Sequence, residues 1–142
     1  MGASTILMAD YSACPLPVAC IVLDSPFACF SELAESLGSQ MGVPKEMIGA
    51  LLPMIEQQVK EVTGGMEIRS LRPIDKVGSL TFPALFIHGV DDTLIPMDHS
   101  ERLYEAYGGS TKEVNYCEGD HNGMRPYETL DLMFAFIQSN FI

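Results

Sequence analysis

Two continuous apolar segments constrain the fold of this chain more than any other feature. Residues 18–26 read VACIVLDSP and residues 84–89 read ALFIHG, and each run ends at a proline or a polar turn. Such runs are typical of strands that are buried on both faces, as in a parallel sheet covered by helices. A third strand is expected at 112–119, where KEVNYCEG alternates polar and apolar residues.

Helical segments separate these strands. The pattern predicts a helix over 2–13 closed by Pro15 and Pro17, two or three short helices within 27–66, a helical turn near 73–77, a helix over 97–109 capped by Asp98, and a final helix over 126–142. The alternation predicts an α/β fold with a parallel sheet covered on both sides.

Two apolar patterns accompany these helices. The final helix is expected to carry Leu130, Phe134 and Ile137 on one face. The methionines at 41, 47, 54 and 66 indicate core packing rather than a cofactor site.

The composition is that of one globular domain. Of 142 residues, 47% are apolar and 19% are charged, so the chain is not disordered. The net charge is −11 and Lys and Arg form no run, so we expect neither nucleic acid nor an anionic membrane as a partner. No apolar run has the length of a membrane span. The four cysteines form no C-x-x-C pair, which favours free, buried thiols in the cytoplasm.

Polar residues follow each expected strand. Asp24 follows the first strand, Asp91 and Asp92 follow the second, and Asp120 and His121 follow the third. The carboxyl ends of parallel strands meet at one edge of the sheet, where ligands bind in such folds. An acid and a histidine on neighbouring loops suit a couple in which the acid fixes the imidazole tautomer while the histidine acts as general base.

The segments LDSPF, PALFIHGVDDTLIP, HSERLYEAYGG and EGDHNGMRP resemble the C-terminal half of an α/β-hydrolase, and they are most similar to serine-aminopeptidase-like hydrolases. The paired motifs are H-G-x-x-D before a loop proline and G-D-H-N about thirty residues later. The resemblance implies that Asp92 is the acid and His121 the base of a Ser-His-Asp triad. It further implies cofactor-free hydrolysis of an ester, thioester or amide, with a small-molecule or acyl substrate.

The same resemblance implies a position for the nucleophile. The family's elbow is G-x-S-x-G, often continued as S-M-G-A, and this chain begins Met1-Gly2-Ala3. Aligned in this way, Met1 follows the nucleophilic serine and contributes an oxyanion-hole N–H. We therefore expect the chain to supply Asp92 and His121 but not the serine, and to be inactive alone. Residues 27–66 are expected to be a helical cap-like insertion that shapes the substrate pocket.

Several assignments of the site residues stay open. Asp91 or Asp24 could replace Asp92 as the acid. A metal site made from His88, Asp92 and His121 is conceivable, but the spacing matches no compact ligand motif and no metal is expected. We interpret His88 as a packed, hydrogen-bonded residue. His99 is expected on a helix surface, and no other serine (Ser4, Ser25 or Ser39) has the flanks of a nucleophile elbow.

An alternative function belongs to a different class. The chain could be a non-catalytic hydrolase-like module that binds a partner or associates through an open sheet edge. The outer edge of the first strand is expected to be bare and apolar, which predicts homo-oligomers. A self-contained small enzyme that activates water with Asp92 and His121 is a third, less favoured reading.

Overall fold

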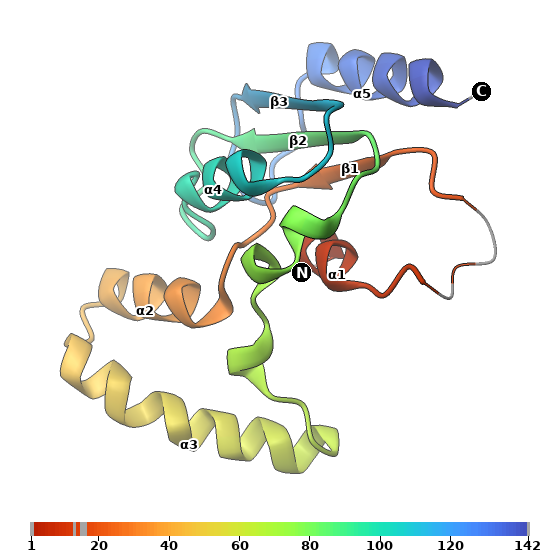
Figure 1. Cartoon of the computed structure of the whole chain (residues 1–142). Coiled ribbons are helices and arrows are strands. Elements are labelled where there is room, and N and C mark those ends of the chain that lie inside the picture. The colour runs from red at the N-terminus through yellow and green to blue at the C-terminus, as the bar shows by residue number, and fades with distance from the viewer. Residues whose placement is uncertain (1, 13, 15–16, 142) are drawn as a thin grey trace. The chain divides into compact units, whose positions relative to one another are not determined.

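The computed structural model describes residues 2–12, 14 and 17–141. Along the chain (Figure 1) the elements are α1 (Gly2–Met8), β1 (Ile21–Asp24), α2 (Phe30–Gln40), α3 (Lys45–Thr63), β2 (Ala84–Gly89), α4 (Asp98–Ala106), β3 (Lys112–Cys117) and α5 (Tyr127–Asn140). Three short 3-10 turns, Ile68–Ser70, Pro73–Asp75 and Val77–Ser79, precede β2. The chain divides into two compact units: unit 1 is Met1–Ala28 with Pro73–Ile142, and unit 2 is Cys29–Arg72.

The three strands of unit 1 form one parallel sheet in the order β1-β2-β3. The strands pair in register, with Ile21 opposite Ala84 and Ala84 opposite Lys112. All six residues of the central strand β2 are buried. A strand that is paired on both edges and covered on both faces needs apolar side chains on each face, which explains its continuous apolar run. The expected α/β fold with a parallel sheet is confirmed.

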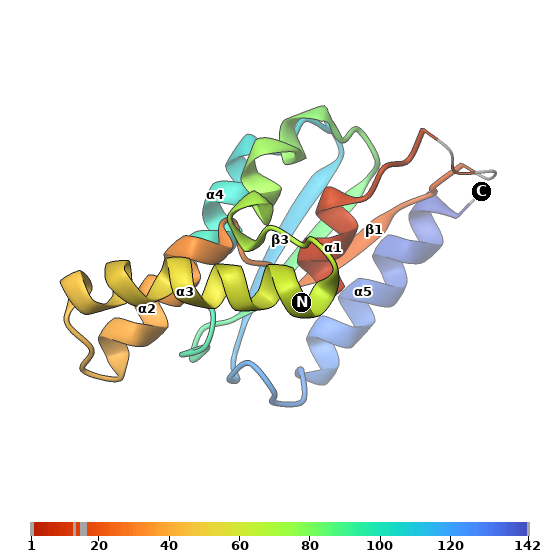
Figure 2. The same ribbon diagram turned by 90° about the horizontal axis from the view of Figure 1, so that it is seen from below.

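The two faces of the sheet bury different helices. Ile21, Leu23 and Phe86 pack on one face with Leu7 of α1 and Leu103 of α4. The alternate residues Leu85 and Ile87 pack on the other face with Phe136 of α5. Figure 2 shows α4 and α5 on opposite sides of the strands. Helices α1 and α4 therefore complete the core on one face of the sheet, and α5 completes it on the other.

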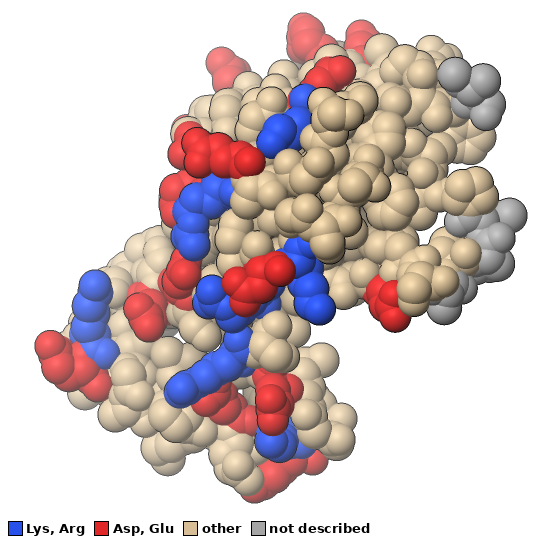
Figure 3. Space-filling view, in the orientation of Figure 1, with Lys and Arg blue, Asp and Glu red and all other residues tan. Residues whose placement is uncertain are grey.

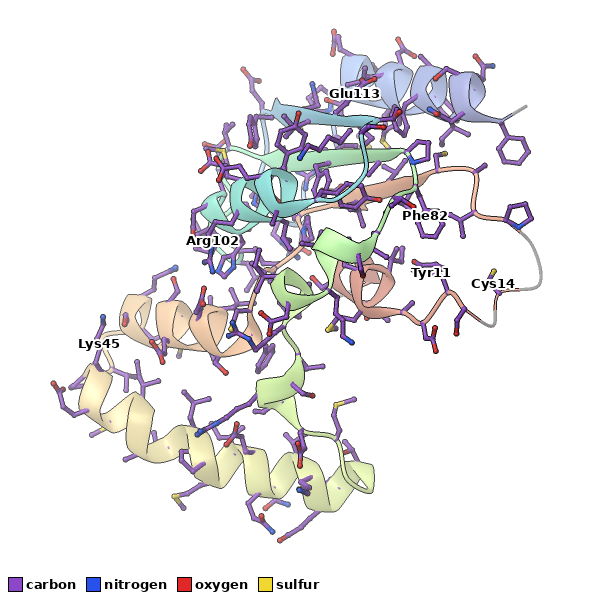
Figure 4. All side chains as sticks on the ribbon, in the orientation of Figure 1. Tyr11, Cys14, Lys45, Phe82, Arg102 and Glu113 are labelled. Atoms are coloured by element: carbon purple, nitrogen blue, oxygen red, sulfur yellow. The ribbon has the colours of Figure 1, made fainter. Side chains whose placement is uncertain are left out.

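Helix α1 ends at Met8, so the helix expected over 2–13 is wrong beyond that residue. The Asp10 carboxylate accepts the Ser12 N–H at 2.9 Å, and such a local bond competes with helix formation. The Tyr11 hydroxyl turns back to donate to the Ile6 carbonyl at 2.8 Å. The Tyr11 ring also packs edge-on against Phe82 with centroids 4.9 Å apart, and Figure 4 shows these side chains close together.

The buried face of α5 differs from the expected one. Phe134 is 66% exposed, whereas Thr129 and Phe136 are buried. The Thr129 hydroxyl donates to the Asn115 side chain of β3 at 3.1 Å, which fixes the rotation of the helix against the sheet. The expected apolar face is therefore wrong at Phe134, whereas Leu130 and Ile137 are partly buried.

Unit 2 contains two helices where two or three were expected. Helix α3 runs without a break through Pro53 and ends at Gly64, whose φ of 73° is in the left-handed region that glycine favours. A Cβ atom on Gly38 of α2 would lie 2.7 Å from Cδ1 of Ile48 in α3, so the glycine permits their close approach. The role of residues 27–66 as a cap stays a prediction.

The methionines of unit 2 are not core residues. Met41, Met47, Met54 and Met66 are between 51% and 83% exposed, so the expected core packing is wrong. The buried face of α3 is instead formed by Ile48 and Leu52. These two residues line an apolar cavity of about 260 Å³ within the unit.

None of the helices in the described part of the chain is long and apolar enough to cross a membrane. On the face drawn in Figure 3, Lys and Arg side chains lie among Asp and Glu side chains. Cys29 and Cys117 are buried, as expected, whereas the expected burial is wrong for Cys14, which is exposed, and for Cys20, which is only partly buried. Association through the outer edge of β1 stays a prediction.

Candidate active site

The loops that follow β2 and β3 are tied together by the backbone. The Val90 N–H donates to the Cys117 carbonyl at 2.8 Å, and the Asp91 N–H donates to the Gly119 carbonyl at 3.2 Å. The first bond continues the register of the two strands beyond their ends, and the second is offset from it by one residue. As a result, Nδ1 of His121 lies 2.8 Å from Oδ2 of Asp92, although 29 residues separate them.

The Asp92 side chain is fully buried and its orientation is fixed by its own loop. Oδ1 accepts the backbone N–H groups of Leu94 at 3.0 Å and Ile95 at 2.8 Å. Burial pushes the pKa of Asp92 upward, but hydrogen bonds from Ile95, His121 and Ser25 and the proximity of His121 outweigh it. The pKa of Asp92 therefore lies below its ordinary value, and the group is an ionised acceptor at neutral pH.

The tautomer of His121 follows from this partner. An ionised carboxylate only accepts hydrogen bonds, so Nδ1 of His121 carries the proton and donates it toward Asp92. In the neutral ring Nε2 is then the acceptor atom. The His121 side chain is 22% exposed, so the ring is partly accessible to solvent. The geometry suits a general base whose orientation is fixed by an acid.

The lowered pKa of Asp92 makes the stability of the fold depend on pH. A carboxyl whose pKa is depressed by folding adds stability above its unfolded pKa, and loses it as pH falls through the folded pKa. We expect the stability difference between the wild type and Asp92→Asn to be constant at neutral pH and to shrink below about pH 4. Urea unfolding of both proteins at several pH values measures this difference. A difference that stays constant down to the lowest pH would contradict the expectation.

The two alternative acids lie elsewhere. The Asp24 carboxylate accepts hydrogen bonds from Arg125, with Nη2 2.7 Å from Oδ1. Asp91 is exposed, as expected for a turn residue, and its Oδ2 accepts the Gly119 N–H at 3.4 Å. The structure brings His121 to Asp92, and to neither of these two residues.

The other two histidines of the chain are buried. Nε2 of His88 lies 2.9 Å from the Ile95 carbonyl and must donate to it, so Nδ1 accepts from the Ser100 hydroxyl at 2.6 Å. His88 is thus a packed, hydrogen-bonded residue, and Nε2 is not available to a metal. In the part of the chain that the structure describes, no group of three His, Cys, Asp or Glu side chains could hold a metal ion.

Two expectations around α4 are wrong. His99 is 3% exposed and its Nδ1 accepts the Ala28 N–H at 3.1 Å, so it does not lie on the helix surface. The reason is that this face of α4 packs toward the segment after β1, where the buried N–H of Ala28 needs an acceptor. Asp98 is the first helical residue; Met97 occupies the N-cap position and forms no side-chain cap bond.

Two residues near the Asp92–His121 pair were not assigned a role from the sequence. The Arg125 side chain is 7% exposed and contacts Asp24, Ser25 and the carbonyl of Asp120. Ser25 follows β1 with a φ of 46°. In the sequence, the one sign of a role for Arg125 is the presence of an arginine in the EGDHNGMRP segment. Its partner Asp24 is too distant in sequence to be predicted. Met1, the expected oxyanion-hole residue, lies outside the described residues.

Solved structures share this fold over almost the whole chain. The Pyrococcus furiosus esterase Pf2001 matches with a TM-score of 0.64 at 17% identity, covering 99% of this chain and 51% of its own. The acetyl xylan esterase from Paenibacillus sp. R4 matches with a TM-score of 0.66 at 16% identity, covering 99% of this chain and 43% of its own. The fold is therefore that of part of an α/β-hydrolase, a three-stranded parallel portion with its flanking helices.

Sequence comparison gives the family. The model of the serine hydrolase (FSH1) family matches residues 52–122, half of the chain, and the match includes Asp92 and His121. The chain belongs to this serine hydrolase family. It is also 36% identical over 122 residues to the uncharacterized protein YqkD of Bacillus subtilis (strain 168), a match that covers 85% of this chain and 39% of YqkD. The chain thus spans well under two thirds of the length of the relatives it matches.

Proposed function

We propose that this chain carries the acid and the base of a Ser-His-Asp hydrolase, with Asp92 orienting His121. His121 Nε2 deprotonates a serine supplied from outside the chain, and the serine attacks an ester, thioester or amide carbonyl. The bond from the carbonyl carbon to the leaving group breaks as the protonated His121 gives its proton to the departing alcohol, thiol or amine. Water, deprotonated by His121, then attacks the acyl-enzyme, and the carboxylic acid and the free serine are released. The 2.8 Å contact between Nδ1 of His121 and the buried Asp92 carboxylate carries this proposal, because it leaves Nε2 as the acceptor.

The serines of the described part of the chain support an external nucleophile. None of their hydroxyls forms a hydrogen bond with His121, whose bonded partner is Asp92. Ser25 is engaged by Arg125 and Asp92, and Ser4 is buried and bonded to the backbone of Phe27. The likeness to serine-aminopeptidase-like hydrolases, and the pocket-shaping role of residues 27–66, belong to the same proposal.

The source transcript upstream of the Met1 codon provides the first test. We expect an in-frame Gly-x-Ser directly before this codon, behind an apolar strand-like run. The longer protein should hydrolyse p-nitrophenyl acetate and react covalently with a fluorophosphonate. The 142-residue chain should do neither, because it supplies no nucleophile.

Either of two results would overturn this proposal. Fluorophosphonate labelling of a serine within the 142 residues would place the nucleophile inside the chain. A transcript in which a stop codon and an untranslated leader directly precede the Met1 codon would instead favour the non-catalytic module that binds a partner.

A further inference from the structure

Arg125 connects the end of β1 to the loop that carries His121. Its Nε and Nη2 atoms donate to the Asp24 carboxylate at 3.0 Å and 2.7 Å. Its Nη1 atom donates to the backbone carbonyl of Asp120, the residue before His121, at 2.8 Å. The bonds to Asp24 raise the pKa of Arg125 above its ordinary value although partial burial opposes them, so the guanidinium stays charged.

Ser25 links the same arginine to the acid. Nη2 of Arg125 lies 3.2 Å from Oγ of Ser25. A guanidinium has no acceptor atom, so Ser25 Oγ accepts from Arg125 and its own proton must point elsewhere. The Asp92 carboxylate is the acceptor for that proton, consistent with the lowering of the Asp92 pKa by a side-chain hydrogen bond with Ser25. Arg125 can only donate and the ionised Asp92 can only accept. The two charged groups therefore fix which way the Ser25 hydroxyl donates.

The backbone around Ser25 and Gly89 is shaped for this arrangement. Among the described residues, Ser25 alone has a side chain together with a positive φ, a conformation that is strained for any residue other than glycine. Gly89 at the end of β2 leaves room for Arg125, because a Cβ atom there would lie 2.7 Å from Nη1. The positive φ of Ser25 and the missing side chain of Gly89 therefore both accommodate the contacts that Arg125 makes.

We propose that Arg125 and Ser25 are positioning residues for the Asp92–His121 pair. Arg125 holds the loop that carries His121, and Ser25 holds the carboxylate to which His121 donates. Geometry matters here as much as charge: a lysine has the charge but one point-like donor group, so it cannot reach Asp24, Ser25 and Asp120 together. The inference rests on the proposed function for its catalytic meaning, but the contacts can be measured without turnover.

The downfield ¹H resonance of the His121 Nδ1 proton is the most direct readout. In the 142-residue chain this proton should be shifted downfield and protected from exchange by its bond to Asp92. Arg125→Gln and Arg125→Lys should both lose the protected resonance, because neither side chain can donate to Asp24 and to the Asp120 carbonyl at the same time. Ser25→Ala should retain the resonance with a changed shift, because it removes one bond to Asp92 and leaves the arginine in place.

Arg102→Gln is the matched control. Arg102 lies on α4, is 41% exposed, and pairs with Asp98 at 3.8 Å, so its loss should leave the His121 resonance unchanged. Figure 4 labels this residue on α4. Far-UV circular dichroism and thermal melting of each variant separate a loosened loop from an unfolded chain.

Specific results would overturn the inference. A folded Arg125→Lys variant with the wild-type resonance would show that charge alone suffices, and an unchanged shift in Ser25→Ala would remove Ser25 from the arrangement. If Arg125→Gln does not fold, these two variants still decide the matter. A protected resonance in the wild-type chain together with no ester hydrolysis by the longer protein would overturn the proposed function and leave the positioning intact.

Discussion

If the proposed mechanism holds, Asp92→Asn should lower kcat of the longer, serine-containing protein about 10⁴-fold while the fold stays in place. The backbone N–H groups of Leu94 and Ile95 need an oxygen at the Oδ1 position. The new amide nitrogen must then occupy the position of Oδ2, where it donates toward Nδ1 of His121. The ring would carry its proton on Nε2 instead, and Nε2 could no longer accept the serine proton. Steady-state hydrolysis of p-nitrophenyl acetate measures the effect.

Two neighbouring carboxylates serve as controls for this prediction. Asp91→Asn should keep wild-type kcat, because Asp91 is exposed and does not contact His121. Asp24→Asn weakens the contact to Arg125 and should reduce kcat less than Asp92→Asn does. A fully active Asp92→Asn variant, or an Asp24→Asn variant that alone loses all activity, would move the acid away from Asp92.

Gly89→Ala should destabilise the fold by about 3 kcal/mol. A Cβ atom at this position would lie 2.2 Å from the Gly119 carbonyl oxygen and 2.7 Å from Nη1 of Arg125. The first of these contacts is with backbone, which a change of rotamer cannot relieve. The loop after β3 must therefore shift, and His121 would shift with it. Urea denaturation of the 142-residue chain measures the loss.

A second glycine gives the matched comparison for Gly89. A Cβ atom on Gly49, inside α3, would meet nothing within 4 Å. Gly49→Ala should therefore stabilise the fold by about 0.5–1 kcal/mol, since alanine has the higher helix propensity. Equal effects of the two substitutions would show that the close approach at Gly89 is not a constraint on the native state.

The sheet could be predicted from the sequence because its signal is local. The apolar run of β2 contains its own evidence of burial on both faces, and all six of its residues are buried. The expected burial of β1 on both faces is wrong, because only alternate residues of this edge strand, Ile21 and Leu23, are buried. The end of α1 and the buried face of α5 could not be predicted in the same way. The first depends on the Asp10 carboxylate competing for a backbone N–H, and the second on a bond between Thr129 and Asn115 of another element.

The same difference between local and long-range signals applies to the residues of the candidate site. Asp92 and His121 could be placed together because both follow strands of one parallel sheet, whose ends meet at one edge. Arg125 and Ser25 could not, since their meaning depends on contacts across the fold. The burial of His99 likewise depends on the N–H of Ala28, which lies 71 residues away in the chain.

The bond between Arg125 and Asp24 joins residues that are 101 positions apart. Closing so long a loop carries an entropic penalty that grows with the logarithm of its length, and contacts of this kind slow folding. During synthesis Asp24 leaves the ribosome long before Arg125. The end of β1 can already pair with β2 through the Ser25 N–H and the Ile87 carbonyl, but its contact with the loop that carries His121 cannot form until the C-terminal segment has emerged.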